Sequence, residues 1–204
     1  MQYADFDSDE MVEKIYYPEL KALLRSRFKP RRIEILEHII RKRHPSYPIA
    51  TGKDYDFQQP ASIVHINYTP AATLSLAKSK LGINPEEFSQ LRTVNSVWKP
   101  LKGPLMDWPL SICNAETVDH INDLTPCEIV GRAEYTENFQ VYHNLSQEWH
   151  YLSGQLPSEL MVFQQSDTAQ HDFKGVPHAG FRHPDTRQED DAPESIEVRL
   201  FMFY

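Results

Sequence analysis

The stretch Glu194-Ser195-Ile196-Glu197-Val198-Arg199-Leu200-Phe201-Met202-Phe203 decides the expected fold of this chain. Large apolar residues dominate it and become nearly continuous from Leu200 onward. A short apolar run of this kind is typical of a strand that is buried in a sheet. We therefore predict a strand over 195–204 that lies inside a sheet.

Other segments extend this expectation toward a mainly β protein. Ile33, Ile35 and Ile39 alternate as in a strand, whereas the periodicity of 8–28 is helical, with Pro18 predicting a break or a kink. Thr69-Pro70 predicts the start of a second helix and Gly82 its end. The expected strands are 32–41, 61–67, 92–98, 110–113, 139–144, 148–153, 160–164 and 195–204. Helices followed by many short strands predict an α+β, mainly β fold: a barrel or sandwich with helices at its N-terminal side.

Composition narrows the class of protein. The 204 residues fit a single domain, 1–204, and 21 basic against 29 acidic residues give a net charge of −8, which argues against nucleic acid as a partner. There is no run of 18 apolar residues and no signal-peptide pattern at the N-terminus, so we expect a cytoplasmic protein without a membrane segment. Two cysteines exclude a four-cysteine zinc site.

The clearest candidate for chemistry is His65-Ile66-Asn67. A His-x-carboxylate pair on a strand points both side chains to one face, and a distant histidine then completes the face that binds non-haem iron. Here the third residue is an amide, which is a weak iron ligand. On spacing alone, a polar histidine at a strand end is the simpler interpretation. His171, His178 and His183 near acidic residues, and His143 with His150 beside Trp149 and Tyr151, have equally simple surface interpretations.

Several longer stretches together resemble one family, the asaB-type hydroxylase/desaturases of fungal secondary metabolism, which include gibberellin desaturase-like proteins. The most specific are Trp98-Lys99-Pro100-Leu101 and Glu194-Ser195-Ile196-Glu197-Val198-Arg199; others include Val64-His65-Ile66-Asn67-Tyr68-Thr69-Pro70, Glu148-Trp149-His150-Tyr151 and Pro177-His178-Ala179-Gly180-Phe181. The resemblance covers nearly the whole chain, which looks shortened at its N-terminus relative to typical members.

The resemblance implies a double-stranded β-helix (jelly-roll) core like that of Fe(II)/2-oxoglutarate oxygenases. It also implies that His65 and His178 match the two iron-binding histidines. Asn67 stands where the family has an aspartate, and Pro193 stands where an Arg-x-Ser motif supplies the arginine that binds 2-oxoglutarate. Further departures are Lys99 for an arginine, Gln147 for a histidine and His150 for a tyrosine. From these losses we predict that the chain uses no cofactor and no metal; if it binds a metal, His65 and His178 are the ligands.

Our first interpretation is therefore a non-oxidative cyclase, for instance of the hetero-Diels–Alder type, that acts on an apolar polyketide or terpenoid intermediate. Orientation and modest polarisation are the sources of rate in such a reaction. Substrate contacts are predicted for Asn67, Trp98, Trp149, Tyr151, Phe181 and Arg199, and acid, base or hydrogen-bonding roles for His65, His150, His178, Lys99 and Asp167.

Two alternatives stay open at this point. One is an active Fe(II)/2-oxoglutarate-dependent hydroxylase or desaturase, with iron on His65 and His178 and with Arg199 or Lys99 binding the co-substrate. The other is a non-catalytic partner subunit. A homodimer is a further expectation. The acidic loop 182–194 has two interpretations that the sequence does not separate, a lid over the site and a disordered insertion.

Overall fold

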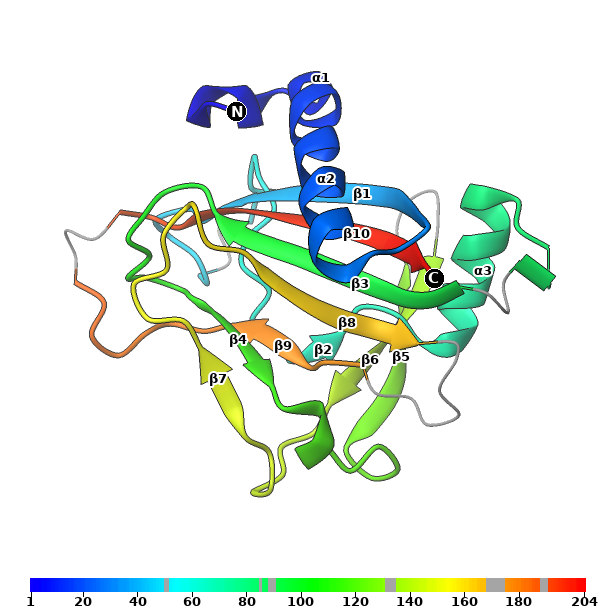
Figure 1. Ribbon diagram of the computed structural model, residues 1–204. Helices are drawn as coiled ribbons and strands as arrows, with labels where there is room; N and C mark the ends of the chain where they lie inside the picture. Colours follow the sequence, from blue (N-terminus) through cyan, green and yellow to red (C-terminus); the bar gives the residue numbers. More distant parts are fainter. Residues whose placement is uncertain (50–51, 85, 88–90, 131–134, 168–174, 188–190) are drawn as a thin grey trace.

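Two antiparallel sheets form the body of the protein (Figure 1), whose computed structural model describes residues 1–49, 52–84, 86–87, 91–130, 135–167, 175–187 and 191–204. The first sheet has the order β1-β10-β3-β8, formed by β1 (Arg32–Lys42), β10 (Glu194–Phe203), β3 (Leu91–Pro100) and β8 (Met161–Asp167). As predicted, the last strand lies inside a sheet, between β1 and β3.

The second sheet has the order β5-β6-β2-β9-β4-β7. Its strands are β5 (Leu124–Val130), β6 (Tyr135–Val141), β2 (His65–Ile66), β9 (His178–Gly180), β4 (Leu110–Cys113) and β7 (Trp149–Tyr151). A short 3-10 helix, Ala115–Thr117, follows β4. Figure 1 shows the two sheets as facing layers. The mainly β, jelly-roll class with N-terminal helices is confirmed.

The N-terminal helices cover the outer face of the first sheet (Figure 1). The chain begins with a 3-10 helix, Tyr3–Asp7, followed by α1 (Asp9–Met11), a π-helical turn (Val12–Tyr16) and α2 (Tyr17–Phe28). Pro18 lies in the first turn of α2, where its missing N–H is tolerated. The irregularity expected at Pro18 is therefore the π turn that precedes it, and the segment continues as a helix.

The helix α3 (Pro70–Leu81), which the sequence predicts, lies at one end of the molecule (Figure 1). The Thr69 side chain accepts a hydrogen bond from the Ala72 N–H, which caps the first turn. Gly82 ends the helix in the left-handed conformation at φ 61°, which glycine adopts without strain. The α3 face packs on Phe201 and Phe203 of β10.

The two faces of β10 divide the interior of the protein. Ile196, Val198, Leu200 and Met202 pack with the N-terminal helices in one buried cluster. Because side chains alternate along a strand, Ser195, Glu197 and Arg199 lie on the opposite face, which looks toward the second sheet. β10 thus contributes polar side chains to the layer between the sheets on one face and apolar side chains to the core on the other.

Two parts of the second sheet differ from the sequence expectation. The strand expected over 61–67 is reduced to His65–Ile66, and β5 and β9 were not expected. Alternation over two or three residues is too short a signal to distinguish a strand from a loop. Within the described part of the chain, no helix is long and apolar enough to cross a membrane.

Candidate functional site

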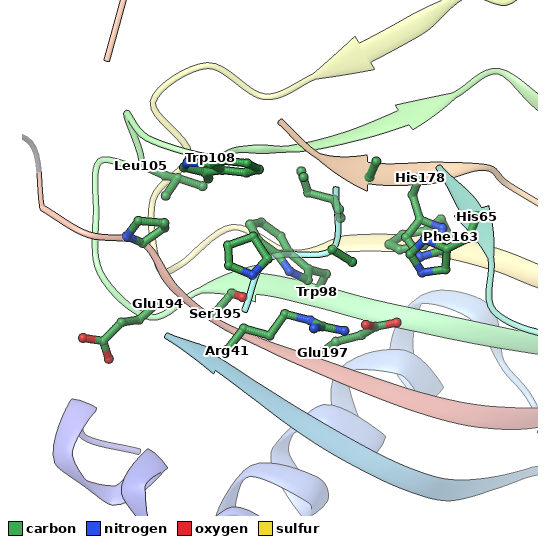
Figure 2. A pocket seen from close by; sticks show the side chains of 16 residues that line it. Arg41, His65, Trp98, Leu105, Trp108, Phe163, His178, Glu194, Ser195 and Glu197 are labelled. Carbon is green, nitrogen blue, oxygen red and sulfur yellow. The ribbon is translucent and has the colours of Figure 1, made fainter. Parts of the chain in front are cut away.

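Two histidines meet at the centre of the second sheet. His65 lies on β2 and His178 on β9, and the two residues are direct partners in the antiparallel register. Side chains of such partners lie on the same face of a sheet. Their ring centroids are 4.4 Å apart with an interplanar angle of 49° (Figure 2). Pairing of two short strands thus brings together residues that are far apart in the sequence.

Both rings are oriented by the backbone in the same way. His65 Nδ1 lies 2.7 Å from the Ile63 carbonyl oxygen, and His178 Nδ1 lies 3.1 Å from that of Val176. A carbonyl only accepts, so Nδ1 carries the proton on each ring and Nε2 keeps its lone pair. His178 Nε2 is buried and has no hydrogen-bond partner in the described protein.

Burial keeps both imidazoles neutral. Burial, with a smaller effect of the neighbouring His65, lowers the pKa of His178 to about 3, although Glu197 opposes the shift. Burial also lowers the pKa of His65. Phe163 covers the His178 ring at a centroid distance of 4.8 Å. The pair therefore presents two neutral nitrogen donors from an apolar surround, which is the protonation state that metals require of histidine.

Asn67 belongs to a buried polar network beside the pair. Its Nδ2 donates to Glu197 Oε1 at 2.8 Å and to Ser96 Oγ at 3.0 Å, and its Oδ1 accepts from Arg199 Nη2 at 3.2 Å. Both atoms of the amide group are thus occupied. Its backbone N–H donates to Gln165 Oε1. This side chain, predicted to contact substrate, also connects β2 to the inner faces of β3 and β10.

Glu197 carries the negative charge of this network. Its side chain is 6 % exposed, and Ser96 Oγ donates to it at 2.8 Å and Arg199 Nε at 3.1 Å. Burial alone raises the pKa of Glu197, but the positive charges of Arg199 and Arg41 outweigh burial and hold the pKa well below its usual range. The carboxylate is therefore ionised and compensated inside the protein.

A small apolar cavity adjoins the histidine pair (Figure 2). Its free space is about 40 Å³, enough for a few water molecules. The walls include Trp98, Leu105, Trp108, Leu110 and Phe163, and Pro193, Ser195 and Glu197 line it from the β10 side. Trp108 has φ 46°, a left-handed conformation that is costly for a bulky residue and that turns its ring toward this cavity.

A larger cavity of about 530 Å³ lies next to the small one and shares Arg41, Pro60, Ala61 and His65 with it. Asn138 and Thr136 line the larger cavity, and Asn138 Oδ1 and Thr136 Oγ1 are buried without a partner in the described protein. A cavity of this size accommodates a small organic ligand. The histidine pair therefore lies at the boundary between the two cavities, within reach of a ligand bound in the larger cavity.

The structure brings some of the predicted residues to this site and leaves others away from it. His65, His178 and Trp98 line the inner cavity, and Asn67 and Arg199 line the larger one. Lys99 lies on the other face of β3, with its ammonium 5.3 Å from the Phe6 ring and 5.7 Å from the Tyr16 ring. Its assignment as an acid or base is therefore corrected, because alternation places it under the N-terminal helices.

The β7 residues also lie away from the cavities. Trp149 and Tyr151 are 37 % and 44 % exposed, His150 is exposed as well, and none of the three lines either cavity. Phe181 packs on Tyr151 instead of on the inner cavity. Their predicted roles are corrected, because β7 is the edge strand of its sheet. Asp167, at the far end of β8, lines neither cavity, and the suggested lid over 182–194 lies partly outside the described residues.

The residues of the site that sequence reasoning missed include Arg41, Trp108, Phe163 and Glu197. Glu197 carried a usable signal, since it is a charged residue in a strongly apolar strand, two residues from Ser195. Arg41 was obscured by the basic run Arg41-Lys42-Arg43, which is simplest to interpret as an exposed strand end. Trp108 and Phe163 show no local pattern that distinguishes them from ordinary core residues.

Comparisons with known proteins agree with this geometry. The family described as "Oxidoreductase/YMDC permease-like domain" matches residues 1–203. The chain belongs to this family. The Fe(II)/2-oxoglutarate-dependent dioxygenase nvfI of Aspergillus novofumigatus is 28% identical over 97% of this chain and 69% of its own length. Aspirochlorine biosynthesis protein N of Aspergillus oryzae is 33% identical over 66% of this chain and 63% of its own length.

A solved structure of the iron and alpha-ketoglutarate-dependent endoperoxidase NvfI superimposes with a TM-score of 0.84 at 28% identity, over 98% of this chain and 72% of that one. The family resemblance and the oxygenase-like fold are thus confirmed. The prediction that the chain uses no cofactor is wrong, because the similar proteins are named as dependent on iron and 2-oxoglutarate. The chain spans about two thirds to three quarters of the length of these relatives.

The histidine pair itself fits a metal. Both rings line one cavity, both have Nδ1 on a backbone carbonyl, and the buried His178 Nε2 lacks a partner, as expected for metal-binding imidazoles. Asn67 does not fit the place of a carboxylate ligand, since both its amide atoms are occupied. Among the described residues no group of three His, Cys, Asp or Glu side chains is arranged to hold a metal. The residues therefore fit a metal held by two imidazoles, with the other positions left to co-substrate and solvent.

Proposed function

We propose that this protein is an iron(II)- and 2-oxoglutarate-dependent oxidoreductase that modifies a small, largely apolar natural-product intermediate. The observation that carries the proposal is the pair of neutral histidines, His65 and His178, whose rings lie 4.4 Å apart and which line the same cavity. The fold and the names of similar enzymes from fungi support the same class of reaction. A homodimer and a cytoplasmic location stay predictions.

The protein's own residues provide binding and orientation. His65 and His178 would hold the metal, and the carbonyls of Ile63 and Val176 fix the direction of their lone pairs. When bound, iron and 2-oxoglutarate supply the activation of dioxygen. Trp98, Trp108 and Phe163 would form an apolar wall beside the pair and limit the water there.

The substrate class follows from the walls of the two cavities. The inner cavity is apolar on the side of Trp98, Trp108 and Phe163, whereas Gln140, Asn138 and Thr136 give the larger one hydrogen-bonding groups. Such a combination suits an apolar skeleton that carries a few oxygen functions. The larger cavity would bind the skeleton of the substrate. The carbon to be modified would lie near the histidine pair, at the boundary between the two cavities.

A ligand-dependent stability measurement tests this function. Ligands that bind the folded state raise its stability, so Fe(II) together with 2-oxoglutarate under anaerobic conditions should raise Tm of the wild-type protein. His178→Ala should lose this shift. His150→Ala is the matched control, because His150 is exposed on β7, and it should keep the full shift. A wild-type protein whose Tm does not respond to both ligands would contradict the proposal.

The neutral Asn67 favours a second candidate, a redox-neutral cyclisation of the same type of intermediate in the same cavities. The amide replaces the charge that a three-ligand iron site has, and Glu197 retains its carboxylate within the network. The two functions differ in stoichiometry. An oxidation releases one succinate for each substrate converted, whereas a cyclisation converts substrate without consuming 2-oxoglutarate.

A further inference from the structure

One position of the inner cavity lacks the cation that the family resemblance leads one to expect. Pro193 stands in place of the arginine of the Arg-x-Ser motif, whose serine is retained as Ser195. Both Pro193 and Ser195 line the inner cavity. The proline has no side-chain donor, so this end of the cavity needs another group if it is to bind a carboxylate.

Arg41 reaches the same place from the neighbouring strand. β1 and β10 are antiparallel, and Arg41 is the direct register partner of Ser195. Directly paired residues project from the same face of a sheet, so Arg41 faces the cavity beside Ser195. Its side chain lines both the inner and the larger cavity, and Figure 2 shows its guanidinium near the Glu197 carboxylate. The cavity has thus kept a cation, which comes from β1 instead of β10.

Arg41 also has donors left for a ligand. Its Nη1 donates to the Gln59 carbonyl oxygen at 2.7 Å, which is the one hydrogen bond that the structure gives its guanidinium within the described part of the chain. An arginine has five N–H donors in a planar fork, so most of them are not used by this bond. Burial lowers the pKa of Arg41, but the charge of Glu197 opposes the shift and the group stays charged.

The neighbouring arginines are committed elsewhere. Arg199 binds Glu197 at 3.1 Å, Glu37 at 3.0 Å and Asn67 at 3.2 Å. Arg43 forms an ion pair with the buried Asp107 at 2.7 Å. The negative charge of Glu197 is already compensated by Arg199 and by the hydroxyl of Ser96. Glu197 therefore leaves part of the positive charge of Arg41 for a ligand.

We propose that Arg41 binds the remote carboxylate of 2-oxoglutarate and thereby replaces the arginine missing from position 193. The inference rests on the proposed function, since it needs the co-substrate to bind beside His65 and His178. A fork-shaped cation matches a carboxylate in two-point geometry, which an ammonium group does not. The keto acid would then extend from Arg41 toward His65 along the boundary that the inner cavity shares with the larger one of about 530 Å³.

The test measures binding by calorimetry, with Mn(II) as a redox-stable metal and two probes. 2-Oxoglutarate carries the remote carboxylate, and 2-oxobutyrate lacks it. Arg41→Gln should weaken the affinity for 2-oxoglutarate by about 10- to 100-fold, which corresponds to the loss of hydrogen bonds to a charged group. The affinity for 2-oxobutyrate should be unchanged. Arg41→Lys keeps the buried charge and so protects folding. It should weaken the affinity for 2-oxoglutarate several-fold.

Two further variants control for charge and position. Lys42→Met removes one positive charge from the adjacent residue, which pairs with Asp7 and Glu194, and should leave both affinities as in wild type. Arg41→Gln combined with Pro193→Arg returns the cation to the residue that directly precedes β10 and should recover 2-oxoglutarate binding. Recovery would show that the position of the cation matters and not only the net charge of the fold.

The outcomes separate this inference from the function on which it rests. If wild-type protein with Mn(II) binds 2-oxoglutarate and folded Arg41→Gln or Arg41→Lys binds it equally well, Arg41 is a structural partner of Glu197 and the inference is wrong. If folded wild-type protein with Mn(II) binds neither keto acid, the proposed function fails, and the inference fails with it.

Discussion

Asn67 is the residue at which this chain departs most clearly from an iron-binding carboxylate. Its Nδ2 donates to Glu197 Oε1 at 2.8 Å, so Asn67→Asp would lose this donor and place two carboxylates together. We expect the metal-free variant to lose about 1–3 kcal/mol of unfolding free energy, the cost of leaving a buried partner unsatisfied. Urea unfolding at pH 7 measures the change.

The double variant Asn67→Asp, Glu197→Gln is the matched control, because it exchanges the acid and the amide without changing the net charge. It should recover most of the lost stability, since a donor again faces a carboxylate across the same contact. A single variant as stable as wild type would mean that the network around Glu197 is looser than the distances indicate.

The buried His178 leads to a prediction about the free energy of unfolding at acidic pH. The folded protein keeps its pKa at about 3, whereas an unfolded chain takes up the proton near pH 6.5. Between these values the unfolded state binds more protons, so stability falls as the pH is lowered. From pH 7 to pH 4 this residue should cost the metal-free protein up to roughly 3 kcal/mol. Urea unfolding across this range should show a shallower pH dependence in His178→Gln, and the wild-type dependence in His150→Gln.

At the scale of elements, the sequence predicts best where a pattern is long and local. β1, β10 and α3 were predicted within a few residues, because alternation, a nearly continuous apolar run and a Thr-Pro start with a glycine end are local signals. β9 was missed, because three residues carry no period and its pairing partners, His65 and Leu110, lie far away in the sequence.

The same limit applies to the candidate site. The family resemblance selected His65 and His178, and strand pairing brings them together. No local pattern indicated that Arg41 faces Ser195, because register between β1 and β10 depends on the whole sheet. Trp149 and Tyr151 were assigned to the cavity for their aromatic character, yet they lie on β7 at the edge of its sheet and are 37% and 44% exposed.

At the scale of the molecule, the first sheet has an apolar core on one face and the polar region of the site on the other. Its outer face and the N-terminal helices form the largest buried apolar cluster, whereas its inner face contributes Ser195, Glu197 and Arg199 to the region of the site. The helices therefore support the site indirectly. They keep β10 in place from behind, and β10 in turn positions the polar groups that hold Asn67.

A pair of adjacent residues on α2 tests this support. Leu24 is 1% exposed and belongs to the apolar cluster on the sheet, whereas Leu23 is 41% exposed. Leu24→Asp would bury an unpaired charge, so we expect a loss of several kcal/mol of unfolding free energy, large enough to unfold a typical domain. Leu23→Asp should stay within about 0.5 kcal/mol of wild type. Thermal unfolding followed by circular dichroism compares the two, and a stable, folded Leu24→Asp would show that the helices are dispensable for the sheet that carries the site.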